Sequence, residues 1–223
     1  MTIQEYFGDW SKVIDLKEAD GILRKLSASN HVICPQFSDI FKAFRLCPLN
    51  SLRVVIIGQD PYPQKGVATG LAFANSPETP ESSYSSSLEV LKESVINYII
   101  PHRTTIFDPS LEKWEAQGVL LLNSALSCEV GRVGSHTLLW RPFIKSLLTN
   151  LSKYHTGIVY LLMGTQAQSL EPYINKQFNH VIRIRHPSWY ARNNVRMSSD
   201  IWQEINQILI GQYGYGVEWY QEY

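Results

Sequence analysis

Three side chains able to do chemistry follow short apolar runs: Asp60, Asn123 and His186. A carboxylate and an imidazole can exchange protons and stabilise developing charge. A side-chain amide offers a hydrogen-bond donor and an acceptor together, so it can read the edge of a ligand. These residue types predict a site that combines charge stabilisation with recognition of a polar molecule.

Each of these residues also has an ordinary structural explanation. An Asp before Pro, as in Asp60-Pro61, commonly marks a turn. Asn123 could cap the next turn, and a single histidine such as His186 often has only a structural role. Taken alone, each signal is weak. Their common place at the ends of apolar runs indicates that a site exists.

Four short apolar runs predict the strands that would position this site. Three of them are continuous, as in strands buried on both faces of a parallel sheet, and the last alternates, as in an edge strand. They are residues 53–57 (RVVII), 119–122 (VLLL), 158–163 (IVYLLM) and 181–185 (VIRIR). Ligands of open α/β sheets bind beyond the carboxyl ends of the strands, so we expect the loops after these runs to meet.

Apolar residues at helical spacing predict helices between and after the strands. These helices cover residues 87–97, 140–151 and 201–210. The alternation of strands and helices indicates an α/β fold, with the first fifty residues packed as helices and loops against one side. The Ser- and Pro-rich residues 76–87 are expected to form a loop within a single domain that spans residues 1–223.

Composition narrows the class of protein. The chain of 223 residues has 44% hydrophobic residues and equal numbers of basic and acidic residues, 20 of each. This is typical of a globular domain, and it excludes a uniformly basic nucleic-acid coat. The first residues lack the pattern of a secretory signal, and no apolar run reaches the length of a membrane span. Three widely spaced cysteines favour a reducing cytoplasm over a disulfide framework or a zinc site.

Several motifs together resemble family 1 uracil-DNA glycosylases. They run in order from about residue 50 to residue 220, and several motifs in register are more specific than any one of them. The resemblance is carried by residues 58–63 with 70–73 (GLAF), 118–124 (GVLLLNS), 135–136 with Trp140 and Phe143, 161–168 (LLMGTQAQ), 186–188 (HPS) and 216–219. It implies a three-layer α/β fold with a central, four-stranded, mainly parallel twisted sheet flanked by helices.

The resemblance also implies a reaction, hydrolysis of the bond between uracil and deoxyribose in DNA. Asp60 would stabilise the oxocarbenium-like sugar and orient water, and His186 would donate a hydrogen bond from a neutral imidazole to O2 of the base. Asn123 would read the Watson–Crick edge of uracil. Gln59 would contact the base through its backbone, Phe73 would stack on the base, and Tyr62 would exclude the methyl group of thymine. No metal and no cofactor is implied.

The remaining implied residues would contact DNA while the nucleotide is flipped out. They are Pro63, Ser87, Ser135, His136, Gly164, Thr165, Pro187, Ser188, Trp189, Tyr190 and Arg192. The partner would be single- or double-stranded DNA, bound by a monomer in the cytoplasm, or in the nucleus of a eukaryotic source. A proteinaceous inhibitor is a further possible partner, and no membrane is implied.

Two departures from the family pattern leave alternatives open. Pro63 stands where the first motif usually ends in His, and Trp189-Tyr190 replaces Pro-Leu, so the wedge that fills the vacated stack would be aromatic. A glycosylase for a modified pyrimidine, or an idle DNA-binding scaffold, therefore remain alternatives. A small-molecule α/β enzyme is disfavoured, because no GxGxxG fingerprint follows a strand.

The distribution of charge supports a DNA partner independently. Residues 131–146 and 181–196 contain basic but no acidic residues, whereas residues 197–223 contain acidic residues and no Lys or Arg. Basic runs with interleaved aromatic residues near the predicted site suit phosphate contact and stacking. The zero net charge predicts weak, salt-sensitive binding.

Overall fold

The computed structural model describes residues 2–98 and 105–222. Its centre is a parallel sheet of four strands in the order β4-β2-β6-β7. The strands are β2 (Val54–Gly58), β4 (Val119–Asn123), β6 (Val159–Met163) and β7 (His180–Ile184). Each lies within one residue of a predicted apolar run, and the alternating run forms an edge strand as expected.

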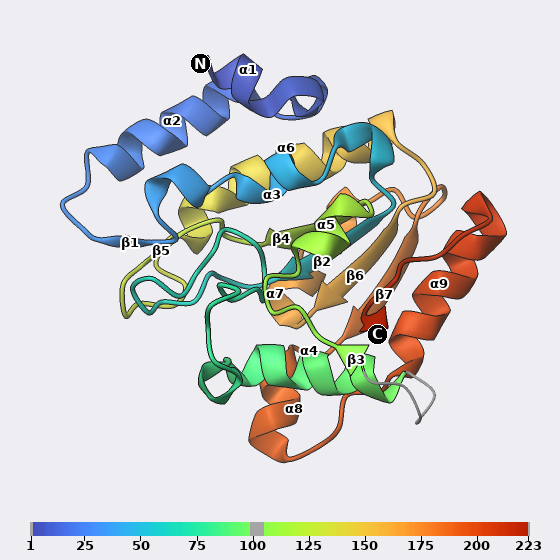
Figure 1. The fold of residues 1–223 in the computed structure, drawn as a ribbon. Coiled ribbons are helices and arrows are strands. Elements are labelled where there is room, and N and C mark those ends of the chain that lie inside the picture. Colours follow the sequence, from blue (N-terminus) through green and yellow to red (C-terminus); the bar gives the residue numbers. More distant parts are fainter. Residues whose placement is uncertain (1, 99–104, 223) are drawn as a thin grey trace.

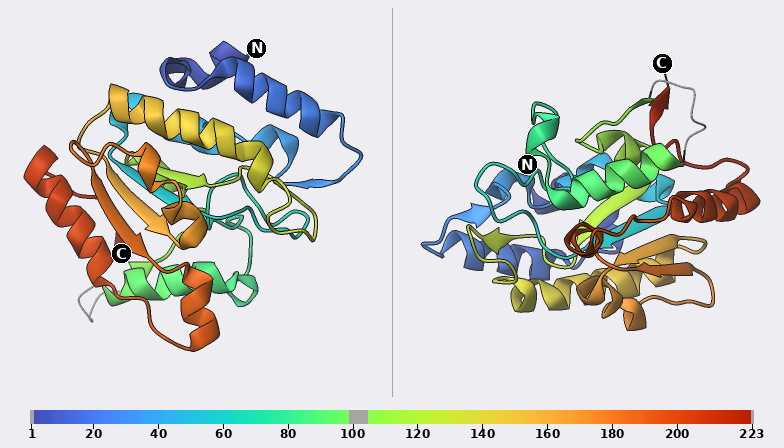
Figure 2. Two further views of the ribbon diagram at one scale, coloured as in Figure 1. Left: turned by 180° about the vertical axis from the view of Figure 1, so that it is seen from behind. Right: turned by 90° about the horizontal axis from the view of Figure 1, so that it is seen from below.

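Helices cover both faces of this sheet, which completes the predicted three layers (Figure 1). One side carries α1 (Ile3–Phe7), α2 (Leu16–Ser27), α3 (Lys42–Leu46) and α6 (Thr137–Tyr154). The other carries α4 (Ser86–Asn97), α8 (Pro187–Asn193) and α9 (Asp200–Tyr213), as both views in Figure 2 show. The short helix α5 (Glu112–Ala116) precedes β4, and the short helix α7 (Thr165–Gln168) follows β6.

Two small antiparallel ladders lie outside the main sheet. β1 (Ile33–Cys34) pairs with β5 (Cys128–Glu129), and β3 (Thr105–Ile106) pairs with β8 (Gln221–Glu222). As expected, the first fifty residues form helices and loops apart from the two residues of β1. Residues 76–85 are loop with a short 3-10 turn, and α4 begins one residue before the predicted helix.

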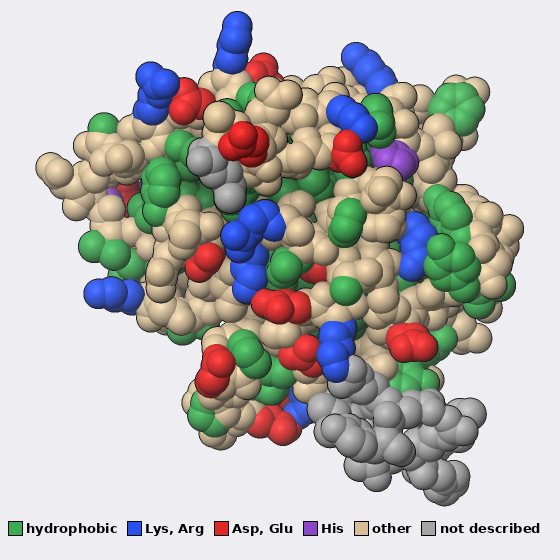
Figure 3. Space-filling model, turned by 45° about the horizontal axis from the view of Figure 1, so that its top comes forward, with side chains coloured by type: hydrophobic (Ala, Val, Ile, Leu, Met, Phe, Trp, Pro, Cys, Tyr) green, Lys and Arg blue, Asp and Glu red, His purple; other side chains and the backbone are tan. Residues whose placement is uncertain are grey.

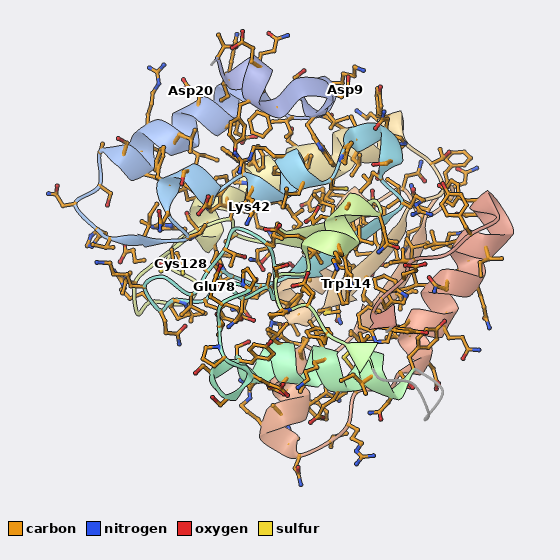
Figure 4. The ribbon with its side chains drawn as sticks, in the orientation of Figure 1. Asp9, Asp20, Lys42, Glu78, Trp114 and Cys128 are labelled. Atoms are coloured by element: carbon orange, nitrogen blue, oxygen red, sulfur yellow. The ribbon has the colours of Figure 1, made fainter. Side chains whose placement is uncertain are left out.

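The core lies between the sheet and both helical layers. The strands β2, β4 and β6 are buried along their whole length, so they needed the continuous apolar runs seen in the sequence. On the α9 side, Trp114, Trp202 and Trp219 pack together with ring centroids 4.8–5.4 Å apart. Trp114 belongs to α5 and is labelled in Figure 4. These contacts tie the C-terminal segment to the body of the fold.

Candidate active site

The loops that follow β2, β4 and β7 line one cavity of about 350 Å³. It lies at the carboxyl end of the sheet, where the strand order predicts that these loops meet. The predicted residues that line it are Gln59, Asp60, Tyr62, Pro63, Phe73, Ser87, Asn123, His186, Ser188 and Arg192. The structure therefore brings together both predicted catalytic residues and all four predicted base-binding residues.

Gly58, at the end of β2, has no side chain and so lets neighbouring side chains lie close to the strand. The parallel register sets Gly58 opposite Asn123. A Cβ atom on Gly58 would lie 2.7 Å from Oδ1 of Asn123 and 2.9 Å from Cζ of Phe73. Asn123 is buried, and none of the described residues occupies its amide with a hydrogen bond. The amide is therefore free to recognise a ligand, and Gly58 makes room for it.

Asp60 is a partly buried carboxyl group that lines the cavity. Its Oδ2 accepts a hydrogen bond of 3.2 Å from Nε2 of Gln59, whereas its buried Oδ1 has no partner among the described residues. Burial raises the pKa of Asp60, and the hydrogen bond from Gln59 opposes this rise. A desolvated carboxylate with one unused oxygen interacts strongly with a nearby positive charge or a water molecule.

His186 has a defined tautomer when it is neutral. It caps the N-terminus of α8, where the backbone N–H of Ser188 donates to its Nδ1 at 3.2 Å. Because Nδ1 accepts this bond, the ring proton lies on Nε2. Burial lowers the pKa of His186, and the charge of Arg192 lowers it further. The imidazole is therefore neutral near neutral pH and presents Nε2–H as a donor.

Gly164 sets the position of His186 from the neighbouring strand. Its φ is +89°, and an added Cβ would lie 2.8 Å from Cβ of His186. Its N–H donates to the carbonyl oxygen of Ile184 at 2.9 Å, which joins the ends of β6 and β7. Gly164 and Thr165 do not line the cavity itself. Gly164 therefore lies behind the imidazole, in a conformation that favours glycine.

Two aromatic rings form walls of the cavity. Phe73 is buried with a φ of +67°, and its ring centroid lies 5.7 Å from that of His186. The hydroxyl of Tyr62 donates to the backbone carbonyl of Phe73 at 2.7 Å. This bond connects the two rings that the sequence predicts to be in contact with the base.

Backbone contacts join the loop after β2 to the loop after β4. The carbonyl oxygen of Gln59 accepts bonds from Oγ of Ser124 at 2.8 Å and from the N–H of Ala125 at 3.1 Å. The backbone N–H of Ser124 donates to the carbonyl of Gly58. The Gln59 carbonyl is thus occupied within the protein, which leaves other atoms of this residue for any contact with a ligand.

Several predicted DNA-contact residues lie outside the cavity lining. Ser135 accepts a hydrogen bond from the backbone of Glu129 through Oγ, at 2.8 Å. His136 is buried, with Nδ1 2.9 Å from Oγ of Ser127. Both therefore support the loop structure beside the cavity. The others outside the lining are Gly164, Thr165, Pro187, Trp189 and Tyr190, of which the last three belong to α8.

Some lining residues were missed by the sequence-based prediction. They are Pro61, Ala68, Leu71 and Val133. Pro61 is a neighbour of Asp60 in the motif and could have been included. Leu71 likewise lies within the motif of residues 70–73 and could have been included. Ala68 and Val133 carry only apolar side chains and come from loops, so nothing in their local sequence marks them. The role of Gly58 in making room for Asn123 could have been predicted, because it is a glycine at the end of a buried strand.

Metal-ligand clusters and membrane-spanning helices are both absent from residues 2–98 and 105–222. Within these ranges, no group of three or more His, Cys, Asp or Glu could hold a metal ion. Among the helices of the same residues, none is long and apolar enough to cross a membrane.

Comparisons with known proteins identify the family. The model of the uracil DNA glycosylase superfamily matches residues 44–210. The uracil-DNA glycosylase of Vibrio campbellii is 32% identical over 97% of this chain and 91% of its own length. That of Escherichia coli is 40% identical over 72% of this chain and 69% of its own.

Solved structures share the fold. The crystal structure of mimivirus uracil-DNA glycosylase superposes with a TM-score of 0.74 at 20% identity, covering 97% of this chain and 92% of the other. A variant of the mimivirus protein in complex with UGI has a TM-score of 0.74 at 19% identity, over 94% and 90% of the chains. Since the family model covers most of the sequence and the cavity contains the motif residues, the chain belongs to the uracil-DNA glycosylase superfamily.

Proposed function

We propose that the cavity beyond β2, β4 and β7 is where this protein, a monofunctional uracil-DNA glycosylase of base excision repair, removes uracil from DNA. The family and the curated relatives support the activity. The observation that carries the assignment of the site is the convergence of Asp60, Asn123 and His186 on one cavity. The product is an abasic site, formed by hydrolysis without a covalent enzyme intermediate.

The chemistry requires that opposite charges be stabilised on the two sides of the breaking bond. Heterolysis of the bond between C1′ and N1 leaves positive charge on the sugar and negative charge on uracil. The carboxylate of Asp60 stabilises the sugar cation and accepts a proton as water adds its oxygen to C1′. A carboxylate that is partly desolvated, with Oδ1 unused inside the protein, is suited to both tasks.

His186 acts on the departing base. Its Nε2–H donates to O2 of uracil, where negative charge accumulates as the bond breaks. The proton stays on the imidazole, because the ring is already neutral and Nδ1 is held as an acceptor by the N–H of Ser188. A low pKa of His186 thus favours a neutral hydrogen-bond donor over a general acid.

Recognition of uracil rests on the amide and on the two rings. The Asn123 amide matches O4 and N3–H of uracil, since it offers an acceptor and a donor together. Phe73 stacks on the extruded base, and Tyr62 closes the space at C5, where thymine carries a methyl group. The backbone of Gln59 adds a contact to the base.

DNA contacts surround the mouth of the cavity. Ser87, Ser188 and Arg192 line it and contact phosphates, together with the Gly164-Thr165 turn. Pro63, Ser135, His136 and Pro187 shape the neighbouring loops. An aromatic side chain of α8 fills the place of the extruded nucleotide.

The chain acts as a monomer, and residues 1–223 form one domain. Contacts between distant segments support the single domain: Nε1 of Trp10 donates to the carbonyl of Cys47, and Nδ2 of Asn150 to that of Val13. The mimivirus complex with UGI supports a protein inhibitor as a further partner. The protein works where the DNA is, in the cytoplasm or, for a eukaryotic source, the nucleus.

Base release from a single-stranded oligonucleotide with one uracil tests this function. The wild type should release uracil, whereas Asp60→Asn and His186→Leu should each lose activity by orders of magnitude. Asp20→Asn and His31→Leu are matched controls, because both residues lie on the surface outside the cavity. No release by folded wild-type protein would exclude the proposed activity.

A panel of bases separates the alternatives in the same assay. Faster release of a C5-modified cytosine than of uracil would establish a modified-pyrimidine glycosylase. Tight DNA binding without release of any base would establish a scaffold. The hydroxyl-anchored Tyr62 ring favours uracil, because it leaves little freedom for a larger C5 substituent.

A further inference from the structure

Ser85 lies outside the cavity lining but contacts one of the residues that form it. It is the N-cap residue of α4, and its Oγ accepts the backbone N–H of Leu88 at 3.1 Å. The same hydroxyl lies 2.6 Å from the hydroxyl oxygen of Tyr62. Ser85 therefore joins the start of a helix to a wall of the active site.

The direction of each hydrogen bond in this chain is determined by its two ends. The backbone carbonyl of Phe73 can only accept, so the hydroxyl of Tyr62 donates to it, at 2.7 Å. The Tyr62 hydrogen is then used, and Ser85 must be the donor of the bond between the two hydroxyls. The N–H of Leu88 can only donate, and it completes the chain at the other end.

This chain of hydrogen bonds, called the relay below, fixes the positions of the two aromatic walls relative to each other. The ring of Tyr62 is anchored at its hydroxyl from two sides, so it cannot move away from the space it closes without losing both bonds. Phe73 has a φ of +67°, which non-glycine residues rarely adopt, and the bond to its carbonyl helps to hold it there. Chains of hydrogen bonds also strengthen one another in a partly buried setting.

We infer that Ser85 is a specificity-determining positioning residue, which acts through Tyr62 to keep the C5 side of the base pocket closed to thymine. The inference rests on the proposed function, because it takes Tyr62 to face C5 of the base. Ser85 itself touches neither substrate nor reacting atoms. Its contribution is to prevent the displacement of Tyr62 that a methyl group at C5 would require.

The test compares release of uracil and of thymine from otherwise identical oligonucleotides. Ser85→Gly removes the hydroxyl while keeping a residue that is tolerated at an N-cap. We expect its ratio of kcat/KM for uracil to that for thymine to fall at least about tenfold, with thymine release rising above the wild-type level. Ser85→Thr keeps a hydroxyl and should restore the wild-type ratio.

Two controls separate positioning from a loss of stability. Asp15→Gly removes the N-cap side chain of α2, which accepts the N–H groups of Lys17 and Glu18 far from the site. It should lower Tm without changing the ratio. Tyr62→Phe breaks the relay at its centre, and adding Ser85→Gly to it should lower the ratio no further, because Ser85 acts only through that hydroxyl.

Each outcome decides the question. If Ser85→Gly keeps the wild-type ratio, or if its effect adds fully to that of Tyr62→Phe, the inference is wrong while the proposed function stands. If folded wild-type protein releases no uracil, the proposed function fails first. A fall in the ratio that Ser85→Thr reverses supports the relay.

Discussion

At the scale of single residues, Asp60 shows how function and stability oppose each other. Its pKa is raised by burial, and Oδ1 has no partner within the described part of the chain. Because the folded pKa lies above the unfolded value of about 3.9, protonated Asp60 favours folding, and this contribution is lost as the pH rises through the folded pKa. At neutral pH the ionised carboxylate therefore lowers the stability of the native state.

This opposition predicts a more stable but inactive variant. Asp60→Asn should raise the free energy of unfolding at about pH 7 by about 1 kcal/mol, or roughly 2–4 °C in Tm. The gain should shrink as the pH falls to about 4, near the unfolded pKa, because folded Asp60 with its raised pKa takes up its proton on the way. Calorimetry across this range measures the effect, with Asp20→Asn on α2 as the control. An equal gain at both pH values would show that charge burial is not the cause.

Gly164 provides a second prediction about a single residue. Gly164→Ala places a methyl group against Cβ of His186 and strains a φ of +89°, so kcat should fall roughly 10- to 100-fold as the imidazole is displaced. Gly214→Ala is the matched control: its φ is +83°, but an added Cβ meets nothing within 4 Å.

Gly214→Ala should lose on the order of 1 kcal/mol from backbone strain, because Gly214 lies in the left-handed helical region with a ψ of −3°. Gly164→Ala should lose more, because a φ of +89° with a ψ of 170° is a conformation that almost only glycine adopts. Only Gly164→Ala should lose activity, as measured by uracil release under saturating substrate. Equal activity of the two variants would mean that the contact with His186 is unimportant.

At the scale of elements, β4 is an edge strand that is covered by other groups. Its inner side pairs with β2. On the other side, the N–H of Leu121 donates to Oε1 of Glu115 at 2.8 Å, and the Leu121 carbonyl accepts from the N–H of Ala72. Glu115 is fully buried, and burial raises its pKa well above the ordinary value. A neutral carboxyl group therefore accepts the hydrogen bond of the Leu121 N–H, which β2 leaves unpaired, on the strand that carries Asn123.

The role of Glu115 predicts different effects for two substitutions. Glu115→Gln keeps a carbonyl acceptor for Leu121 and should change the free energy of unfolding by less than about 1 kcal/mol. Glu115→Ala leaves that N–H without a partner and opens a cavity, which should cost roughly 2–4 kcal/mol. Denaturant unfolding measures both, and equal losses would contradict a neutral Glu115.

Helix α8 gives different surroundings to the two aromatic residues that could act as a wedge, Trp189 and Tyr190. The ring of Trp189 lies 4.0 Å from the guanidinium carbon of Arg185, and it packs edge-on against Tyr190. Tyr190 packs against the hydrophobic core and lines the groove between α4 and α8. This placement favours Trp189 as the residue that enters DNA.

The comparison of duplex and single-stranded substrates tests this assignment. Trp189→Ala should lose roughly tenfold more kcat/KM on duplex than on single-stranded uracil DNA, since only a duplex must be unstacked. Tyr190→Ala should lower Tm and affect both substrates alike. The assignment would be reversed if Tyr190→Ala showed the selective duplex loss.

At the scale of the whole molecule, the arrangement of charge matters more than its sum. The face drawn in Figure 3 carries acidic and basic side chains intermixed, as a net charge of zero allows. The basic runs predicted from sequence are partly neutralised by acidic residues outside them: Glu171 pairs with Arg183, and Glu129 with Arg132. Arg192 lines the cavity and forms no ion pair with any described carboxylate.

Salt dependence of DNA binding should distinguish these arginines. In the inactive Asp60→Asn background, Arg192→Ala should reduce the slope of log Kd against log salt concentration by roughly 0.7–0.9, the loss of one phosphate contact. Arg183→Ala is the control, because its charge is already paired with Glu171. Equal slopes for the two variants would show that Arg192 does not contact phosphate.

Much of this protein could be predicted from its sequence because the relevant signals are local. Apolar runs without alternation located β2, β4 and β6 to within one residue, since a strand covered on both faces admits few polar side chains. The motif order located Asp60, Asn123 and His186. The structure confirms that these three residues meet, although their roles remain predictions until variants are assayed.

Other features were decided only by the tertiary structure, because they depend on contacts between different structural elements that no local sequence pattern specifies. The Ser85 hydroxyl reaches Tyr62, the carboxyl of Glu115 reaches an edge strand, and Glu171 cancels Arg183. No periodicity or motif encodes such pairs, since each is set by how helices and loops pack on the sheet. The sequence by itself thus determined the strands and the reactive groups, whereas packing determined which neighbours orient, neutralise or expose them.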